Sequence, residues 1–158
     1  MTDKGTIKNE IVISKEDAVF WLDRNGCWHN ESGKFQHKKI IDFFHASIRK
    51  DAGGFHLRQV RDDGLEKVYF PYEDTALFVF DVIEDGGLTL VLNTGARIEL
   101  VPSELCVQND SLYVRHGEDR IKFTERALMK VSSRLDFSRE RYYFSADGQQ
   151  IEVPVCTP

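Results

Sequence analysis

The chain has 158 residues, of which 41% are hydrophobic and 30% charged, and its formal net charge at pH 7 is −5. These proportions are ordinary for a globular domain, and no apolar run approaches the roughly 20 residues that a membrane-spanning helix needs. The first ten residues lack the apolar stretch of a secretory signal peptide. Three cysteines, Cys27, Cys106 and Cys156, are scattered singly, which favours a reducing compartment over a disulfide framework. We therefore expect a cytoplasmic protein with no membrane span.

The charge is unevenly distributed along the chain. Residues 27–60 contain six Lys and Arg against three Asp and Glu, and residues 111–141 contain eight against five, so each segment carries +3. Residues 61–110 contain three basic residues against eleven acidic ones, which gives −8. A nucleic-acid-binding domain is usually basic overall, so this pattern argues against nucleic acid as a partner. It leaves room for a local basic site.

The first half of the chain predicts strands, then a helix, then strands. Residues 1–13 are polar and are expected to be loosely held, as chain ends often are. A short turn is expected at 15–17, and the Asn25-Gly26 pair predicts a hairpin turn. Apolar patterning predicts strands at 19–22, 27–29, 55–60 and 67–70. Ile40, Ile41, Phe44 and Ile48 recur with the period of an amphipathic helix, which is expected to end at 51–54.

The second half predicts a β-meander followed by a similar arrangement. The meander strands are expected at 76–83, 88–92 and 97–101. A hairpin around Leu105 and Leu112 follows, and Thr124 suits the N-cap of a helix that carries Leu128, Val131 and Leu135. A last hairpin turns at residues 146–148. Two helices among about ten mostly antiparallel strands predict an α+β protein.

The two halves can be aligned with each other. At an offset of 85, residues 20–28 match 105–113 as an apolar run, a polar turn and an apolar run. At an offset of 87, the apolar positions of the first predicted helix fall on those of the second. We interpret this as two small repeated subdomains, each with antiparallel strands and one helix. The first repeat domain spans 14–73, and the β-meander with the second repeat domain spans 74–158.

No segment carries a recognisable catalytic or metal-binding signature. His29, His37 and His45 are spaced by eight residues, which is not the i, i+4 spacing of a helical zinc site. Cys27 and Cys106 lie on predicted strands, where a cysteine usually packs as a small hydrophobic residue. We therefore expect no metal, no cofactor and no enzymatic activity.

A basic cluster lies at the predicted start of the first helix. Lys34, His37, Lys38 and Lys39 gather where the helix dipole disfavours cations, so a bound anion would remove an electrostatic conflict. The alternative interpretation is that these are solvated lysines that favour solubility. The second half repeats the theme more weakly, with Arg120, Lys122 and Arg126.

Several short motifs resemble a bacterial family of unknown function with a duplicated two-domain core. They are Asn25-Gly26-Cys27-Trp28, Gly33-Lys34-Phe35, the Lys38-Lys39 pair opening a helix rich in Ile and Phe, Phe55-His56-Leu57, and Tyr72-Glu73-Asp74. The resemblance implies that the second domain is superficially like a pleckstrin-homology fold. It also implies a role in signal transduction, with a ligand bound between the two domains, for which a nucleotide-based molecule is one proposal. It assigns Trp28, Lys38 and Lys39 to that ligand. The chain departs from the family pattern at Asn25 and at Thr75-Ala76-Leu77.

These observations lead to one main hypothesis and two alternatives. The main one is a non-enzymatic regulatory protein that binds a small anionic ligand between its repeats. Lys38 and Lys39 would meet the anionic group, and Arg58 and Arg126 would add charge. Trp28 or Tyr69 would pack against a ring.

The first alternative is a protein interaction module that uses a strand edge or the acidic middle of the chain. The second is a hydrolase or transferase acting on nucleotides, for which Asp42 or His37 would be the general base.

Overall fold

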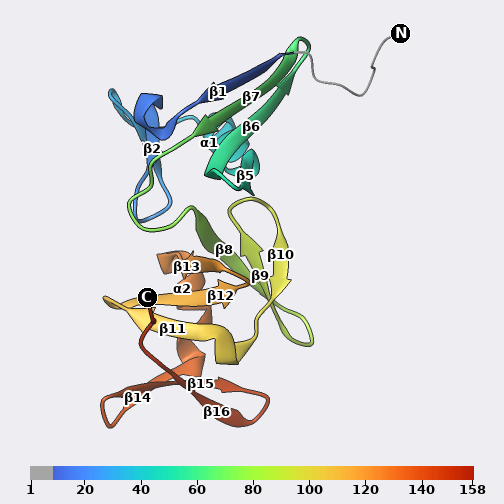
Figure 1. Ribbon diagram of the computed structural model, residues 1–158. Helices are drawn as coiled ribbons and strands as arrows, with labels where there is room; N and C mark the ends of the chain where they lie inside the picture. Colours follow the sequence, from blue (N-terminus) through green and yellow to red (C-terminus); the bar gives the residue numbers. More distant parts are fainter. Residues whose placement is uncertain (1–8) are drawn as a thin grey trace. The chain divides into compact units, whose positions relative to one another are not determined.

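The computed structural model describes residues 9–158 (Figure 1). The chain divides into two compact units, residues 1–76 and 77–158, called unit 1 and unit 2 below. The described residues form two α-helices and sixteen short strands in four sheets, so the fold is α+β. Most strand pairs are antiparallel, as expected. Neither of the described helices is long and apolar enough to cross a membrane.

Unit 1 contains two sheets and one helix. A three-stranded sheet comprises β2 (Phe20–Leu22), β3 (Trp28–Asn30) and β4 (Gly33–Lys34). Helix α1 (Lys38–Ala46) follows it. A four-stranded sheet has the order β1-β7-β6-β5, with β1 (Glu10–Ile13), β5 (Ile48–Asp51), β6 (Gly54–Arg61) and β7 (Gly64–Tyr69). A single 3-10 turn at Lys15–Asp17 joins the two sheets, in agreement with the expected turn.

Aromatic side chains make up much of the core of unit 1. The indole of Trp28 meets the ring of Phe70 at 4.9 Å and that of Phe44 at 5.3 Å between centroids, both edge to face. Phe20 also meets Phe44, at 5.0 Å. Trp28 and Phe70 are each 1% exposed. Edge-to-face pairs of this kind add about 1 kcal/mol each beyond their buried area, so they fix α1 against β2 and β3.

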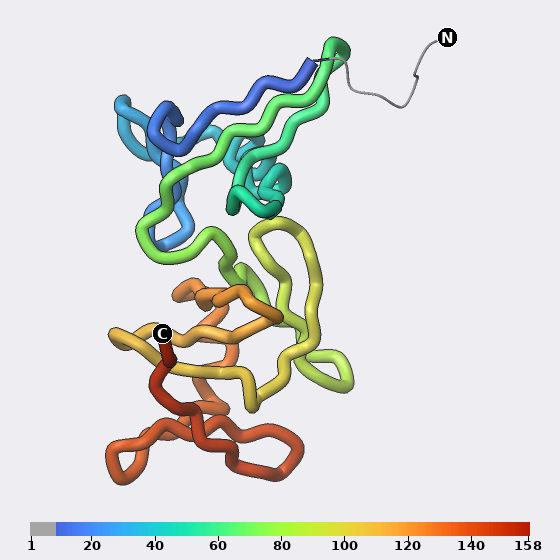
Figure 2. Tube along the Cα trace, viewed as in Figure 1, coloured from blue at the N-terminus to red at the C-terminus, as the bar shows by residue number. Residues whose placement is uncertain are grey.

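Unit 2 is built on a six-stranded half-barrel sheet, whose chain path Figure 2 traces. Its order is β10-β9-β8-β13-β12-β11, with β8 (Leu77–Glu84), β9 (Leu88–Leu92), β10 (Arg97–Glu99), β11 (Leu105–Gln108), β12 (Ser111–His116) and β13 (Asp119–Phe123). The expected meander is confirmed as β8, β9 and β10. The apolar strand β8 lies inside the sheet and pairs in parallel with β13.

The core of unit 2 joins this sheet to α2 (Glu125–Val131) and a three-stranded sheet. That sheet comprises β14 (Leu135–Ser138), β15 (Arg141–Ala146) and β16 (Gln149–Val153). Ala127 and Val131 of α2 and Phe144 of β15 are fully buried, together with Val79 of β8. Burying each valine or phenylalanine side chain stabilises by roughly 2 kcal/mol, so α2 is fixed on both sides by apolar packing.

The structure differs from the sequence-based expectation at the first strand and at the ends of the two helices. Residues 1–8 lie outside the described residues, but Glu10–Ile13, expected to be loosely held, form β1. The reason is a parallel pairing with β7, in which Ile13 lies opposite Val68. Both helices are shorter than expected, because Ile48 and Leu135 begin strands, and residues 51–54 form the β5–β6 turn.

The cysteines are the clearest correction. Cys106 on β11 and Cys156 near the C-terminus form a disulfide, with Cα atoms 4.8 Å apart. The expectation of single cysteines is therefore wrong for two of the three, while Cys27 is free and partly buried. The two half-cystines are 50 residues apart in the sequence, and a pairing of Val155 with Val107 brings them together. The cysteine pattern thus no longer supports a reducing compartment.

A similar run of elements occurs in both units. Three antiparallel strands lie directly before the helix, β2–β4 in unit 1 and β11–β13 in unit 2, and three strands follow it. Outside this run, unit 1 begins with β1, and unit 2 begins with β8, β9 and β10. Ile48 pairs with Leu57 on β5 and β6, and Leu135 pairs with Phe144 on β14 and β15. Leu135 and Phe144 each lie 87 residues after their counterparts Ile48 and Leu57, which is the offset found in the sequence.

Candidate functional site

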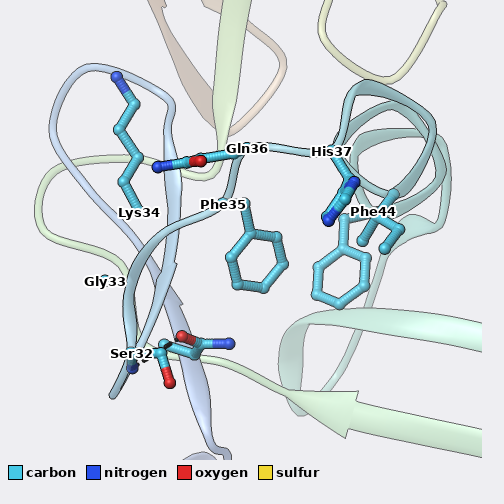
Figure 3. A pocket seen from close by; sticks show the side chains of 9 residues that line it. Ser32, Gly33, Lys34, Phe35, Gln36, His37 and Phe44 are labelled. Carbon is cyan, nitrogen blue, oxygen red and sulfur yellow. Dashed lines mark hydrogen bonds between the residues drawn. The ribbon is translucent and has the colours of Figure 1, made fainter.

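Unit 1 contains a cavity of about 460 Å³ beside the start of α1. Its wall comes from the β3–β4 turn, from the segment that leads into α1, and from α1 itself (Figure 3). The lining residues are Asn30, Ser32, Gly33, Lys34, Phe35, Gln36, His37, Ile40 and Phe44. This volume lies within the range of small-molecule sites, which is about 300 to 1,000 Å³.

The local sequence explains how this wall forms. The side-chain oxygen of Asn30 accepts a hydrogen bond from the backbone N–H of Ser32 at 2.9 Å, which closes the β3–β4 turn. The backbone N–H of Phe35 donates to the carbonyl of Trp28 at 2.9 Å and ties the next segment to β3. The ring of Phe35 meets that of Phe44 at 5.1 Å, edge to face, and Figure 3 shows both rings at the cavity. One side of the cavity is therefore apolar.

The N-terminus of α1 has neither a side-chain cap nor an acidic residue in the first turn of the helix, and its N-cap residue is His37. Helix α2 differs, because the Thr124 hydroxyl accepts from the Ala127 N–H at 3.3 Å and Glu125 lies in the first turn. The first N–H groups of a helix have no acceptor within the helix and attract negative charge. The α1 terminus thus has the character of an anion site.

The four members of the predicted basic cluster are not equivalent. Lys34 and His37 line the cavity. In Figure 3 the side chain of Lys34 extends away from the phenyl rings of Phe35 and Phe44. Lys38 is exposed and its Nζ lies 2.6 Å from a carboxylate oxygen of Asp42, one turn along the helix. Lys39 is exposed and belongs to the same first turn. Of the two candidate bases, His37 therefore reaches the cavity wall and Asp42 is paired with a lysine.

Trp28 belongs to the core. Its indole Nε1–H donates to Nδ1 of His45 at 3.3 Å, and the two side chains are 1% and 2% exposed. Burial lowers the pKa of His45 to about 4, against the opposing effects of the Asp42 charge and a hydrogen bond to the Gly26 carbonyl. Trp28 does not line the cavity beside α1. Its contact with Phe44 places it directly behind the aromatic wall.

Tyr69 takes part in a separate polar network on the second sheet of unit 1. Its hydroxyl donates to Asp51 at 2.9 Å, and Lys67 donates to the same carboxylate at 3.1 Å. The hydrogen bond from Lys67, with those from Tyr69 and the Gly53 N–H, lowers the pKa of Asp51 to about 2 against the effect of burial. Burial and the Asp51 carboxylate raise the pKa of Tyr69. Its phenol is therefore held by protein groups.

The two candidate arginines lie apart from the cavity lining. Arg58 is an exposed residue of β6, opposite Lys67 of β7. Arg126 belongs to unit 2, where its guanidinium lies 3.8 Å from the carboxylate of Asp81, a residue that Lys130 also contacts. Hydrogen bonds from Lys130 and the Val82 N–H lower the pKa of Asp81.

His29 and His45, two of the four histidines of unit 1, have separate partners. His29 lies 2.7 Å from the Asp23 carboxylate and stacks on Trp21, while His45 contacts Trp28. Burial raises the pKa of Asp23, but hydrogen bonds from the Cys27 N–H, His29 and the Asn25 N–H outweigh it and give a net lowering. Within residues 9–158, no group of three or more His, Cys, Asp or Glu side chains is placed to hold a metal ion.

Sequence reasoning missed the neutral part of the cavity. Asn30, Ser32 and Gln36 were not singled out, and Phe35 appeared only within a family motif, although these residues supply hydrogen-bonding groups and one ring. The usable signal was Asn30 followed by Ser32 and Gly33 between two strand segments, which is typical of a side-chain-closed turn. In the structure this turn and the start of α1 line the same cavity.

Comparisons with known proteins inform the fold. No family model matches the sequence, and a search of curated proteins finds no match. Among solved structures, a DUF1285 family protein from Silicibacter pomeroyi DSS-3 is similar, with a TM-score of 0.60 and 14% identity over 92% of this chain and 83% of that chain. A DUF1285 family protein from Shewanella baltica OS155 gives 0.47 and 15% identity over 68% of this chain and 84% of that chain. The first similarity indicates a common fold, shared with a bacterial protein whose family name denotes no function.

Proposed function

We propose that the protein is a non-enzymatic regulatory protein that binds a small anionic ligand in the cavity of unit 1. One observation carries the proposal: the uncapped start of α1 opens beside a cavity whose wall includes Lys34 and His37. Free N–H groups and cations together favour a phosphate or a carboxylate. The rings of Phe35 and Phe44 favour an adjoining apolar or ring portion. Nucleotides combine both features and are the first class to test.

The proposal assigns different roles to the basic residues. Lys34 and His37 would contact the ligand directly from the cavity wall. Lys38 and Lys39 would act mainly through their charge at the helix start, and Lys38 is partly neutralised by Asp42. Exposed charges act weakly and are screened by salt. Affinity is therefore expected to fall as ionic strength rises.

A thermal-shift titration with inorganic phosphate, pyrophosphate and ATP tests the proposal. A ligand that binds only the folded state raises the melting temperature in a dose-dependent way. We expect the shift to be largely lost in Lys34→Ala/His37→Ala and reduced in Lys38→Ala/Lys39→Ala. Arg97→Gln/Arg139→Gln is the control, because it removes two positive charges from exposed positions of unit 2. Equal shifts in all four proteins, or none in the wild type, would contradict the proposal.

The recurrence of elements supports a further part of the proposal, that the two units arose by duplication. The common offset of 87 for the Ile48–Leu57 and Leu135–Phe144 pairs is the supporting observation. The pleckstrin-homology likeness of the second domain, the signalling role and the cytoplasmic location remain predictions. Fractionation of producing cells, with antibody detection, would test the location.

A further inference from the structure

Unit 2 contains a cavity of its own, with a volume of about 530 Å³. It is bounded by the β11–β12 turn, by α2, by the beginning of the β14–β15 hairpin, and by the C-terminal residues after β16. The apolar part of its lining consists of Val107, Leu112, Leu128, Leu135, Tyr142 and Val155. The space is thus larger than the cavity beside α1, and its walls are mainly aliphatic.

The polar part of the lining contains one acidic residue and no basic one, whereas the cavity of unit 1 contains Lys34 and His37. It comes from the β11–β12 turn and from Ser132 at the end of α2. Asp110 is the one lining residue with a carboxylate, and no lysine or arginine is among the lining residues. Among the lining residues an anionic group would therefore meet no cation and one like charge, and Arg120, outside the lining, already donates to the Gln108 amide oxygen at 2.8 Å. A hydroxyl or amide would find hydrogen-bonding partners in Asn109 and Ser111.

One wall is made by the C-terminal segment. The N–H of Val107 donates to the carbonyl of Pro154, and the N–H of Cys156 donates to the carbonyl of Val107, both at 2.9 Å. These two bonds hold Val155 beside Val107 as an added parallel strand. Both valines line the cavity, so the position of the C-terminal segment determines whether that wall exists.

The segment is also held covalently. The disulfide joins Cys106, the residue before Val107, to Cys156, the residue after Val155, and the two cysteines are 4% and 9% exposed. Arg115 adds a polar clamp, because its Nη2 donates to the carbonyl of Thr157 at 2.6 Å and to its hydroxyl at 2.9 Å. Without the disulfide, these hydrogen bonds would be the recorded bonds that hold the segment after Val153, and segments held by few bonds open readily.

We propose that this cavity binds a small uncharged amphiphile, and that the Cys106–Cys156 disulfide holds its C-terminal wall in place. The apolar body would lie against the three leucines, and a hydroxyl or amide head would meet the β11–β12 turn. A dithiol reductant would break the S–S bond, supply two electrons and two protons to give two thiols, and itself become a disulfide. The wall would then be released and the site would weaken.

Nuclear magnetic resonance titrations with 1-octanol and octanoate test the ligand class. The two probes share a chain length and differ in head-group charge. We expect saturable shifts of amides in residues 107–112 and 128–135 with octanol, and binding of octanoate that is about fivefold weaker or more. Intermolecular contacts from the octanol methyl group to Leu128 and Tyr142 should appear in the wild type. Octanoate binding as tightly as octanol, or the absence of these contacts, would overturn the proposal.

Two variants on neighbouring positions of α2 provide the matched comparison. Leu128→Phe would fill the cavity, while Met129→Phe makes a similar change at a residue that is 75% exposed and outside the lining. We expect octanol affinity to fall about tenfold in the first and less than about twofold in the second. Equal affinities in two folded variants would contradict the assignment, and the methyl-group contacts in the wild type decide the question if Leu128→Phe does not fold.

The disulfide's part is tested by repeating the octanol titration after reduction with dithiothreitol and in Cys156→Ser. We expect affinity to fall about fivefold or more in both, with faster amide exchange at residues 155–157. Unchanged octanol affinity in the reduced protein would overturn the role of the disulfide. A lower octanol affinity in Cys156→Ser, measured without reductant, would support it.

Discussion

The indole N–H of Trp28 and the imidazole Nδ1 of His45 form a buried hydrogen bond at the centre of unit 1. A neutral imidazole can accept this bond, whereas an imidazolium cannot, because both of its nitrogens carry protons. The bond therefore couples the charge state of one residue on α1 to the packing of the aromatic core. It also predicts how the unit responds to acid.

Unit 1 should lose stability as the pH falls from about 6.5 to about 4. The pKa of His45 is about 4 in the folded chain and 6.5 for the model group, so the unfolded state binds more protons in this window. The stabilisation is complete above pH 6.5, and its loss by pH 4 is on the order of 3 kcal/mol. Urea denaturation followed by tryptophan fluorescence reports on unit 1, because Trp21 and Trp28 are the two tryptophans of the chain.

His45→Asn is the matched variant for this experiment. An asparagine can still accept from Trp28 but does not titrate. We expect it to be less stable than the wild type at pH 7.5 and to show a flatter pH dependence between 6.5 and 4. An unchanged slope in this variant would assign the acid sensitivity to other groups.

The Asp51 network should control the ionisation of Tyr69. The Asp51 carboxylate accepts from the Tyr69 hydroxyl, and it raises the pKa of that phenol after the larger effect of burial. Asp51→Asn should therefore lower the pKa of Tyr69, measured by ultraviolet absorbance of the phenolate. Tyr69→Phe identifies the signal among the five tyrosines. A pKa that does not move in Asp51→Asn would contradict this coupling.

The same network should protect unit 1 at strongly acidic pH. The pKa of Asp51 is lowered from 3.8 to about 2, so its stabilisation is present above pH 3.8 and lost as the pH falls toward 2. This pH range lies below the one in which His45 titrates. Asp51→Asn should therefore remove the loss of stability between pH 3.8 and 2 and leave the loss between pH 6.5 and 4 unchanged.

Thr124 should contribute to unit 2 through two hydrogen bonds. Its hydroxyl accepts from the Ala127 N–H as the N-cap of α2 and donates to the carbonyl of Val79 on β8 at 3.0 Å. Thr124→Ala is expected to lower the free energy of unfolding by about 1 to 2 kcal/mol. Thr124→Ser keeps the hydroxyl and should restore most of it. Hydrogen exchange of the α2 amides measures the effect, and equal exchange in both variants would argue against a role for the hydroxyl.

Gly64 should be sensitive to substitution because of its close approach to the chain before β1. A Cβ at Gly64 would overlap the carbonyl of Asn9, which accepts a hydrogen bond from the Leu65 N–H at 2.8 Å. Gly54 also has a positive φ, of +109°, but a Cβ there would meet nothing within 4 Å. Gly54→Ala should cost about 1 to 2 kcal/mol from backbone strain alone.

Gly64→Ala should cost more than Gly54→Ala and should also increase hydrogen exchange along β1. Urea denaturation and exchange at residues 10–13 measure the two effects. Equal costs with β1 unchanged would show that the chain before β1 moves aside freely.

Local chemistry accounts for the features that the sequence predicted well. Thr124 as an N-cap and the Asp147-Gly148 turn depend on residues within a few positions of each other, and both occur as expected. The helix ends were less accurate, because apolar spacing continues through Ile48 and Leu135 while both residues begin strands. Periodicity alone does not distinguish the last turn of a helix from the start of a strand.

Long-range pairing accounts for most of what was missed. Strand β1 exists because β7 lies beside it, and the disulfide forms because Val155 pairs with Val107. Neither partnership leaves a signal in neighbouring residues. For the candidate site, the charged residues Lys34 and His37 could be found from the sequence, since helix starts have known electrostatics. Asn30 and Gln36 line the same cavity because of where the β3–β4 turn lies relative to α1, and that placement is not evident from the local sequence.

The parallel pairing of β1 with β7 has a practical consequence for production of the protein. A chain shortened to begin after Ile13 would leave the N–H and C=O groups along that side of β7 without a neighbour. Such an open strand edge invites pairing with other chains, so a shortened protein is expected to self-associate even if each remaining core packs correctly. Strand β1 is itself the edge of the sheet, but its four residues present a shorter open edge than the six residues of β7 would. Vectors that add or remove residues near Glu10 should therefore preserve β1.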